Sequence, residues 1–201
     1  MKYKVFTSTS PLSDLNFDVA AGKKVRMVLV FVGEISGEIN INCTLAERTM
    51  VEFYVATVLR GRSDFRLNYL AEHVGAESES KFVLRGNLDD EARKKSTLGI
   101  HFAKGAVGAI GSEDEKVFLL SAGARNISIP RVDCDEDDVI GTHSASTGSI
   151  DANALKFLMS RGLTERAARN RLEFANVASI INMIDDEKVL KCIYEELDYE
   201  A

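Results

Sequence analysis

Short segments typical of β-strands fill residues 24–143, with turn-forming or charged residues between them. Several segments alternate apolar and polar residues. In residues 38–43, for example, Ile39, Ile41 and Cys43 share one face of the strand. Such alternation predicts strands that are buried on one side. The clearest segments read KVRMVLVFV, EININC, VEFYVATVL, FRLNYLAEHV, TLGIHFA, KVFLLSA and NISIPRVDC.

Glycines and charged residues separate these segments, and residues 85–88 (RGNL) are expected to form one of the turns. Successive strands are spaced by roughly 10 to 15 residues, which fits a sandwich, a barrel or a solenoid of stacked coils. Because no strict sequence repeat is visible, the pattern alone leaves these three architectures open.

The pattern becomes helical after residue 150 and remains helical to the end of the chain. Asp151 is expected to be the N-cap of a first helix, and Gly162 to end it in a left-handed conformation. Thr164 is expected to cap a second helix, and residues 185–186 to open a third. The sequence therefore predicts a mainly β part over residues 1–150 and a short helical subdomain over residues 151–201.

Composition excludes several classes of function. The 201 residues carry a formal net charge of −6, so we expect no general attraction to nucleic acid or to a membrane surface. Residues 27–32 form the longest apolar run, which is too short to span a bilayer, and the first residues lack the pattern of a secretory signal. We therefore expect a cytoplasmic protein. Its cysteines Cys43, Cys134 and Cys192 are too far apart in sequence for a disulfide framework or a structural zinc site.

One stretch carries a specific combination of motifs. An acidic pair and a valine lead into a strand with a histidine, which is followed by a Thr-x-Gly-x-Ile-Asp motif and a helix that ends in Ser-Arg-Gly. The residues are Asp137-Asp138-Val139, Thr142-His143-Ser144-Ala145, Thr147-Gly148-Ser149-Ile150-Asp151 and Leu155-Lys156-Phe157-Leu158-Met159-Ser160-Arg161-Gly162-Leu163. This combination resembles the SufB/SufD family of the SUF iron–sulfur cluster assembly system. The resemblance extends with lower density over most of residues 51–172.

The resemblance implies a right-handed parallel β-helix followed by carboxy-terminal helices, and so favours the solenoid among the three architectures. Two features depart from the family pattern. The β segments begin almost at once, without the long amino-terminal helical region that is usual in the family. Gly141 stands where some SufD-type sequences have a cysteine, two residues before the histidine.

The resemblance also implies a site for a transient iron–sulfur cluster, with no cofactor bound permanently. His143 is the first candidate ligand, since this position lies at the dimer interface of the family and imidazole ligates iron. Cys134 and Asp138 are the further candidates. Each has a simpler interpretation: His143 as an interface hydrogen-bonding residue, Cys134 as a small buried hydrophobic residue, and the acidic run as a solvated turn. Cys43 is expected in the core, Cys192 in packing or at a partner contact, and His73 and His101 in structural roles.

The family resemblance implies a SufC-like ABC ATPase as partner, bound through the helical tail, and a homodimer or a heterodimer with a paralogue. The simpler interpretation is that the helices only cap the open end of the β-helix. The chain has no P-loop motif and is expected to be a scaffold rather than an enzyme. Two alternatives remain: a structural partner of the ATPase that binds no cluster, and a β-helix enzyme acting on polysaccharide. The candidate partner-binding residues are Leu155, Phe157, Leu158, Arg161, Phe174, Val177 and Ile181.

Overall fold

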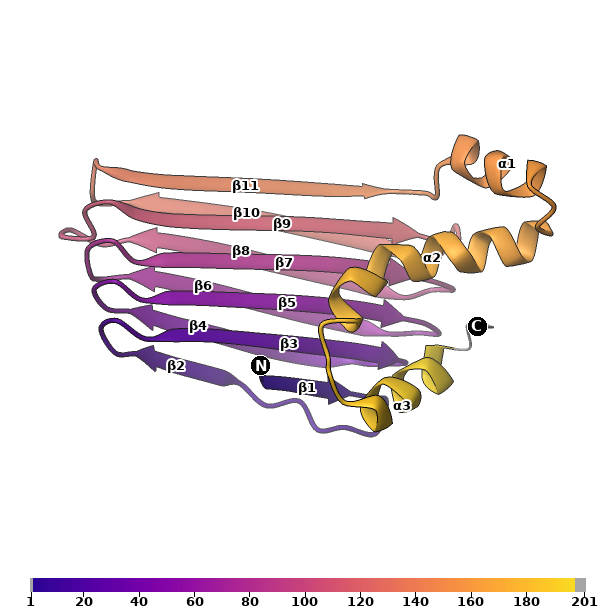
Figure 1. Cartoon of the computed structure of the whole chain (residues 1–201), viewed down its shortest axis with the longest axis horizontal. Coiled ribbons are helices and arrows are strands. Elements are labelled where there is room, and N and C mark those ends of the chain that lie inside the picture. Colours follow the sequence, from indigo (N-terminus) through magenta and orange to yellow (C-terminus); the bar gives the residue numbers. More distant parts are fainter. Residues whose placement is uncertain (1, 198–201) are drawn as a thin grey trace.

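A computed structural model describes residues 2–197 as a stack of parallel β-strands with helices along one side (Figure 1). The strands are β1 (Lys2–Phe6), β2 (Leu15–Val19), β3 (Lys24–Gly33), β4 (Gly37–Leu45), β5 (Met50–Leu59), β6 (Asp64–His73), β7 (Glu79–Leu88), β8 (Arg93–Phe102), β9 (Ala109–Leu119), β10 (Arg125–Cys134) and β11 (Val139–Gly148). The helices are α1 (Ala152–Ser160), α2 (Glu165–Ile181) and α3 (Glu187–Leu197). None of these helices is both long enough and apolar enough to cross a membrane.

The strands form two sheets, and the chain passes from one sheet to the other at every turn. The odd-numbered strands make a six-stranded sheet in the order β1-β3-β5-β7-β9-β11, and the even-numbered strands a five-stranded sheet in the order β10-β8-β6-β4-β2. All pairs are parallel. In Figure 1 the odd-numbered strands lie in front and run to the right, and the fainter even-numbered strands lie behind and run to the left. Since the chain also rises from β1 at the bottom to β11 at the top, the winding is right-handed. The predicted parallel β-helix is confirmed, as a solenoid of about five turns.

The lumen between the two sheets holds the main apolar core. Alternate residues of each strand point inward, so the alternation seen in residues 38–43 buries Ile39, Ile41 and Cys43. Aromatic side chains from successive coils lie on one another, with ring centroids 4.7 Å apart for Phe6 and Phe31 and 4.8 Å apart for Phe31 and Phe65. Phe6 and Phe31 are register partners in the odd-numbered sheet, and Phe65 packs on Phe31 from the facing sheet, so aromatic rings join both sheets in the lumen.

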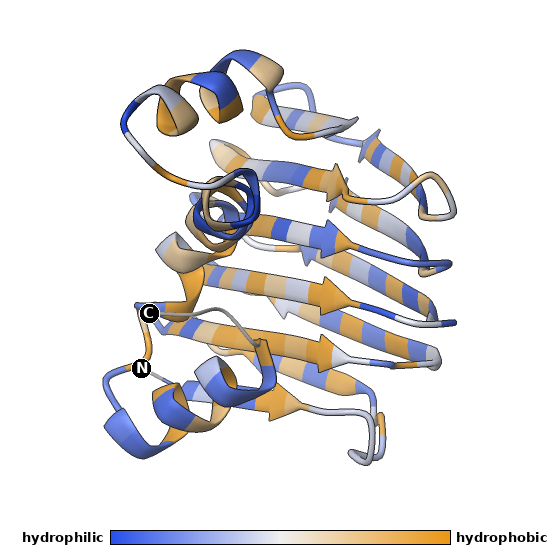
Figure 2. Ribbon diagram, turned by 90° about the vertical axis from the view of Figure 1, so that its right-hand side faces the viewer, coloured by the Kyte–Doolittle hydropathy of each residue, from blue (hydrophilic) through white to orange (hydrophobic). Residues whose placement is uncertain are grey.

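The outer face of the odd-numbered sheet is also buried, because α2 and α3 cover it. Val28, Val30 and Val32 of β3 are at most 1% exposed, and they belong to a second apolar cluster with Val177 and Ile181 of α2. This double burial explains why residues 27–32 are continuously apolar rather than alternating. Figure 2 shows the helices gathered on one side of the stacked coils. The interpretation of the helices as a cap on the open end is therefore wrong, since α2 and α3 lie against the side of the solenoid.

The predicted helix boundaries are confirmed by their capping contacts. The Asp151 carboxylate accepts a hydrogen bond from the Asn153 amide, and Thr164 Oγ1 accepts one from the Ala167 amide. Gly162 follows α1 with φ of +98°, the left-handed conformation expected of it. Asp186 caps α3 through the amides of Lys188 and Val189.

The expected turn at residues 85–88 is wrong, because these residues lie inside β7. Gly86 and Asn87 are an attachment point for α2. Asn176 of that helix donates hydrogen bonds of 2.9 Å to the Gly86 carbonyl and to the Asn87 side-chain oxygen. Asn87 in turn donates to the Glu173 carbonyl at 2.8 Å. These two residues near the carboxyl end of β7 thus orient the helix on the sheet.

We predict that Asn176→Leu lowers the free energy of unfolding by about 1–3 kcal/mol, because both hydrogen bonds from this buried amide to β7 are lost. Urea unfolding followed by circular dichroism measures the change. Asn170→Leu is the matched control on the same helix, at a partly exposed position, and should stay within about 0.5 kcal/mol of the unchanged protein. Equal losses for the two variants would contradict the anchoring role of Asn176.

Candidate functional site at the open end of the solenoid

The last coil, made by β10 and β11, has no further coil above it in the part of the chain that the structure describes. Among the β11 residues only Val139 is half-buried, and the others are exposed. The strand has no lysine, arginine, acidic residue or proline, the residues with which exposed sheet edges are usually protected. Strand β1, at the other end of the same sheet, is five residues long and carries Lys2 and Lys4. The two ends of the solenoid therefore differ in chemistry.

His143 faces the lumen at this open end. Thr147, four residues further along β11, accepts a 2.9 Å hydrogen bond from Asn126 of β10 across the lumen. A side chain built at Gly141 would also point inward, at Val132 and Phe102. Because residues two apart in a strand share a face, His143 between these two positions points the same way. The expectation that Gly141 and His143 share one face is consistent with this geometry.

The packing around Gly141 explains why no thiol is present there. A Cβ atom at this position would lie 2.9 Å from Val132 Cγ1 and 3.2 Å from Phe102 Cε2. Gly111, its register partner in β9, is equally close to Ile100 and Phe102. Large side chains of the facing sheet thus fill the space beside both glycines, and a cysteine at position 141 would displace Val132.

The other two predicted ligands lie away from His143. Cys134 ends β10 and is exposed, so its interpretation as a buried small hydrophobic residue is wrong. Its register partner Phe102 is buried, but no coil covers Cys134 itself. Asp138 is exposed in the turn before β11, five residues from His143, a distance of roughly 16 Å along an extended strand. One metal ion cannot contact both Asp138 and His143 of the same chain.

Beneath the open coil the lumen changes from apolar to polar. Lys94 and Glu115, whose side chains are 0% and 1% exposed, form a 2.8 Å ion pair. Ser96 and Ser128 donate hydrogen bonds of 2.6 Å and 2.9 Å to the other oxygen of Glu115. Burial favours the neutral form of Glu115, but the Lys94 charge and these hydrogen bonds hold its pKa below the ordinary value. Burial lowers the pKa of Lys94.

Glu113 belongs to the same layer but lacks such contacts. It is 3% exposed, and neither carboxyl oxygen has a hydrogen-bond partner. Burial, together with the nearby charge of Glu115, raises the pKa of Glu113 to about 8. In the ladder between β9 and β11, Glu113 is the register partner of His143. A neutral buried carboxyl group therefore lies one strand below the imidazole.

The remaining candidate residues have structural surroundings. His73 is fully buried between the hydroxyls of Ser78 and Ser80, at 2.8 Å from each, and burial lowers its pKa to about 4. His101 contacts Asp135 at 3.1 Å on the outside of the even-numbered sheet. Burial raises the pKa of the Cys43 thiol to about 12, and Cys192 is exposed on α3. Within residues 2–197 no three histidine, cysteine or acidic side chains converge as a metal site.

The predicted partner-binding residues divide by exposure. Val177 and Ile181 are fully buried against the odd-numbered sheet, so their assignment to a partner surface is wrong. Leu155, Leu158 and Phe174 are half-buried, and the Phe174 ring packs on Tyr194. Phe157 is 58% exposed, with the Arg161 guanidinium 5.2 Å from its ring centroid. Helix α1 buries none of its own residues, so Phe157 and Arg161 remain available to a partner.

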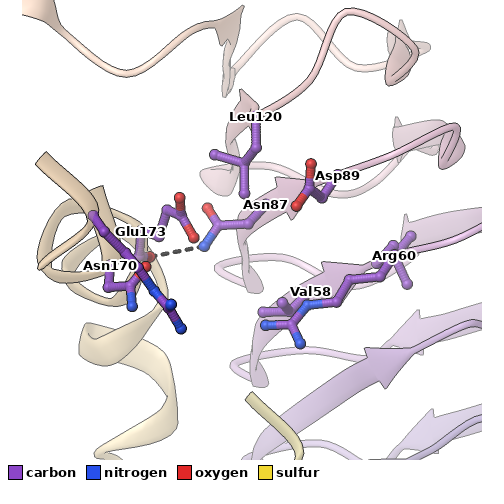
Figure 3. A pocket seen from close by; sticks show the side chains of 9 residues that line it. Val58, Arg60, Asn87, Asp89, Leu120, Asn170 and Glu173 are labelled. Carbon is purple, nitrogen blue, oxygen red and sulfur yellow. Dashed lines mark hydrogen bonds between the residues drawn. The ribbon is translucent and has the colours of Figure 1, made fainter. Parts of the chain in front are cut away.

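A polar cavity of about 290 Å³ lies between α2 and the ends of β5, β7 and β9 (Figure 3). Two positively charged residues, Arg60 and Arg166, and two negatively charged residues, Asp89 and Glu173, line it. Because the two signs are equally represented, the lining has no net charge to select an ion. The open end of the solenoid therefore remains the candidate site.

The sequence analysis missed Glu113 because the strand predicted in this region, KVFLLSA, begins only at Lys116. In the structure β9 begins at Ala109, and Glu113, Glu115 and Val117 alternate inward along it. The available signal was this alternation of glutamates two residues apart. Two charged residues on the inner side of a strand contradict the usual pattern of burial, so this alternation does not look like that of a buried strand.

Comparisons with known proteins find sequence similarity to iron–sulfur cluster assembly proteins. The chain is 31% identical over 137 residues to the iron–sulfur cluster assembly protein SufD of Bacillus subtilis, which is 67% of this chain and 31% of that protein. It is 22% identical over 173 residues to SufD of Plasmodium falciparum, covering 86% of this chain and 12% of that protein. A SufBD family protein of Mycobacterium tuberculosis is 34% identical over 103 residues, which is 51% of this chain and 12% of that protein.

The chain thus spans less than a third of the length of each of these relatives. Residues 8–175 match the family described as "SUF system FeS cluster assembly, SufBD core domain", from the turn after β1 to well inside α2. Since that match covers most of the solenoid and the open coil, the chain belongs to the SufBD core family of SUF iron–sulfur cluster assembly proteins.

Proposed function

We propose that this chain is a scaffold subunit for iron–sulfur cluster assembly, which works as a dimer and with an ABC-type ATPase. The cluster is cargo, held transiently at the open end of the solenoid. The observation that carries the proposal is the last coil, where His143 faces an uncovered lumen on a strand that has no protected edge. The polysaccharide-acting alternative has lost its basis, because the family match covers residues 8–175.

A second chain is the occupant that best fits the open coil. Strand β11 presents ten residues of uncharged backbone edge beside an exposed Ile140, and such an edge pairs readily with another strand. A two-fold contact would bring two copies of His143 together. It would also supply ligands that one chain lacks. A homodimer and a heterodimer with a paralogue both meet these requirements.

The structural-partner function remains the second candidate. It is favoured by Gly141, where packing leaves no room for a thiol, and by the separation of His143 from Asp138 within one chain. In that case the open coil would still pair with a second chain and α1 would still contact the ATPase, but no iron would be held between the two subunits.

We predict that the purified chain is a dimer at roughly 50 µM, a concentration at which even a weak specific interface is occupied. Ala145→Glu should make it a monomer, because two introduced carboxylates would be forced together in the uncovered coil. Light scattering after size exclusion measures the mass. Ala20→Glu adds the same charge in an exposed turn at the other end of the solenoid and should remain dimeric. If the unchanged chain is a monomer and also forms no heterodimer with a paralogue, the proposed contact through this end of the solenoid is excluded.

We predict that anaerobic reconstitution with iron and sulfide produces sulfide-to-iron absorption, and that His143→Ala greatly weakens it because a ligand nitrogen is lost. Circular dichroism should be unchanged, since His143 is exposed. Cys134→Ala separates two possibilities: a ligand thiol would remove the absorption, and a thiol without that role would leave it intact. If the unchanged chain forms no cluster beside its ATPase, the structural-partner function replaces the scaffold.

We predict that a SufC-like ATPase binds the chain through α1. Replacing Phe157 and Arg161 together by alanine should reduce co-purification of the ATPase at least about tenfold, because exposed aromatic and arginine side chains carry much of the energy of an interface. Lys156→Ala, on the same exposed helix, is the control and should bind normally. Deleting the whole tail would be a poorer test, because α2 and α3 cover apolar residues of β3. If the double variant binds the ATPase normally, the ATPase does not bind through these residues of α1.

A further inference from the structure

We infer that Glu113 is a carboxylate ligand for a divalent iron ion that enters the open lumen and is held between Glu113 and His143. The inference rests on the proposed function, and it assigns the form in which iron first arrives: a ferrous ion in a nitrogen and oxygen site. Glu113 was not among the ligands expected from the sequence.

The first observation is that both oxygens of Glu113 lack a hydrogen-bond partner although the residue is 3% exposed. Leaving a buried polar group unpaired costs roughly 1–3 kcal/mol, and more when the group is charged. Buried carboxylates are usually paired or bound to a metal. An unpaired carboxyl group at this depth is therefore available to a cation that reaches the lumen.

The contrast with Glu115 shows that the polar layer does not simply lack donors. Glu115, two residues along the same strand, accepts hydrogen bonds from Lys94, Ser96, Asn126 and Ser128. Four donors thus converge on this one carboxylate. Lys94 is thereby occupied, and Glu113 faces the lumen without a counter-charge in contact.

The second observation is the register of the last two strands of the sheet. Glu113 and His143 are direct partners in the parallel ladder of β9 and β11, and both point into the lumen. Neighbouring strands lie about 4.8 Å apart, so an ion between the two side chains can be contacted by an imidazole nitrogen from above and a carboxylate oxygen from below. Because the residues of β11 around His143 are exposed, the ion would enter from this end of the lumen.

The chemical types of the two ligands indicate which form of iron they would bind. Imidazole together with carboxylate suits ferrous iron, whereas thiolates are needed for a preformed cluster. Cys134 lies at the end of β10, away from this pair, and Gly141 provides no thiol beside His143. One chain supplies one imidazole and one carboxylate, and a second chain across the open coil would double both. Such a set holds Fe²⁺ before sulfide reaches it.

The test is an anaerobic titration of the purified full chain with Fe²⁺, read by competition with a coloured ferrous chelator. Glu113→Gln and His143→Gln should each weaken binding by roughly tenfold or more, the scale that even outer partners of metal ligands contribute. Asp138→Asn removes a carboxylate from the exposed turn and should bind as the unchanged chain does. Co²⁺ in place of Fe²⁺ should give absorption without a thiolate-to-metal band.

The outcomes separate the inference from the proposed function. If Glu113→Gln binds Fe²⁺ normally while His143→Gln does not, Glu113 is no ligand and the scaffold proposal stands. A thiolate-to-Co²⁺ band, or a loss of binding in Asp138→Asn equal to that in Glu113→Gln, would place the ion at the turn and overturn the inference. If the unchanged chain dimerises and binds its ATPase but takes no Fe²⁺, the ferrous site is excluded and the structural-partner function remains. Because His143 is exposed, His143→Gln gives a readout even if Glu113→Gln folds poorly.

Discussion

The hydrogen-bonding of a parallel ladder is the constraint on which the rest of this structure depends. Each strand of the solenoid satisfies its backbone groups only through the coils above and below it, and the register continues from β1 to β11 without a break. A stack built in this way must end in an unsatisfied edge. At β1 the edge is short and carries lysines, and at β11 it is long and uncharged. The position of the candidate site follows from this difference.

The outer faces of the two sheets differ, because helices cover one of them and not the other. The odd-numbered sheet has an apolar outer surface on β3 and β5, and α2 and α3 cover it. Asn176 fixes α2 near the carboxyl end of β7. The even-numbered sheet has a mostly polar outer face, where side chains such as Asn16 and Asn42 hydrogen-bond between coils, although Leu70, Ile127 and Ile129 are exposed on it. Only one side of the solenoid therefore needs helices. This leaves α1, the helix nearest the end of β11, free to present Phe157 and Arg161.

The interior changes as the coils approach the open end. Aromatic and aliphatic side chains fill the lumen in the first coils. In the coil of β8 and β9, beneath the open one, Lys94, Glu113 and Glu115 partly replace them. A buried ion pair of this kind adds little stability over an apolar pair of similar volume. Its effect here is to occupy Lys94, so that the acid beneath His143 remains without a partner. The polar layer is thus better understood as part of the site than as part of the core.

The sequence by itself determined most of the strands and all three helices, because alternation, helical periodicity and capping residues such as Asp151 and Thr164 are local signals. The family resemblance distinguished the solenoid from a sandwich or a barrel, and it directed attention to His143. Other features depended on contacts between segments distant in the sequence. These are Asn87 bound to Asn176 of α2, Val177 and Ile181 of α2 buried against β3, and Glu113 below His143. The exposure of Cys134 likewise depends on the absence of a covering coil in the described residues. Only the tertiary structure decided these, because burial in a solenoid is set by which coil lies next in the stack, and that neighbour is absent from the local pattern of the chain.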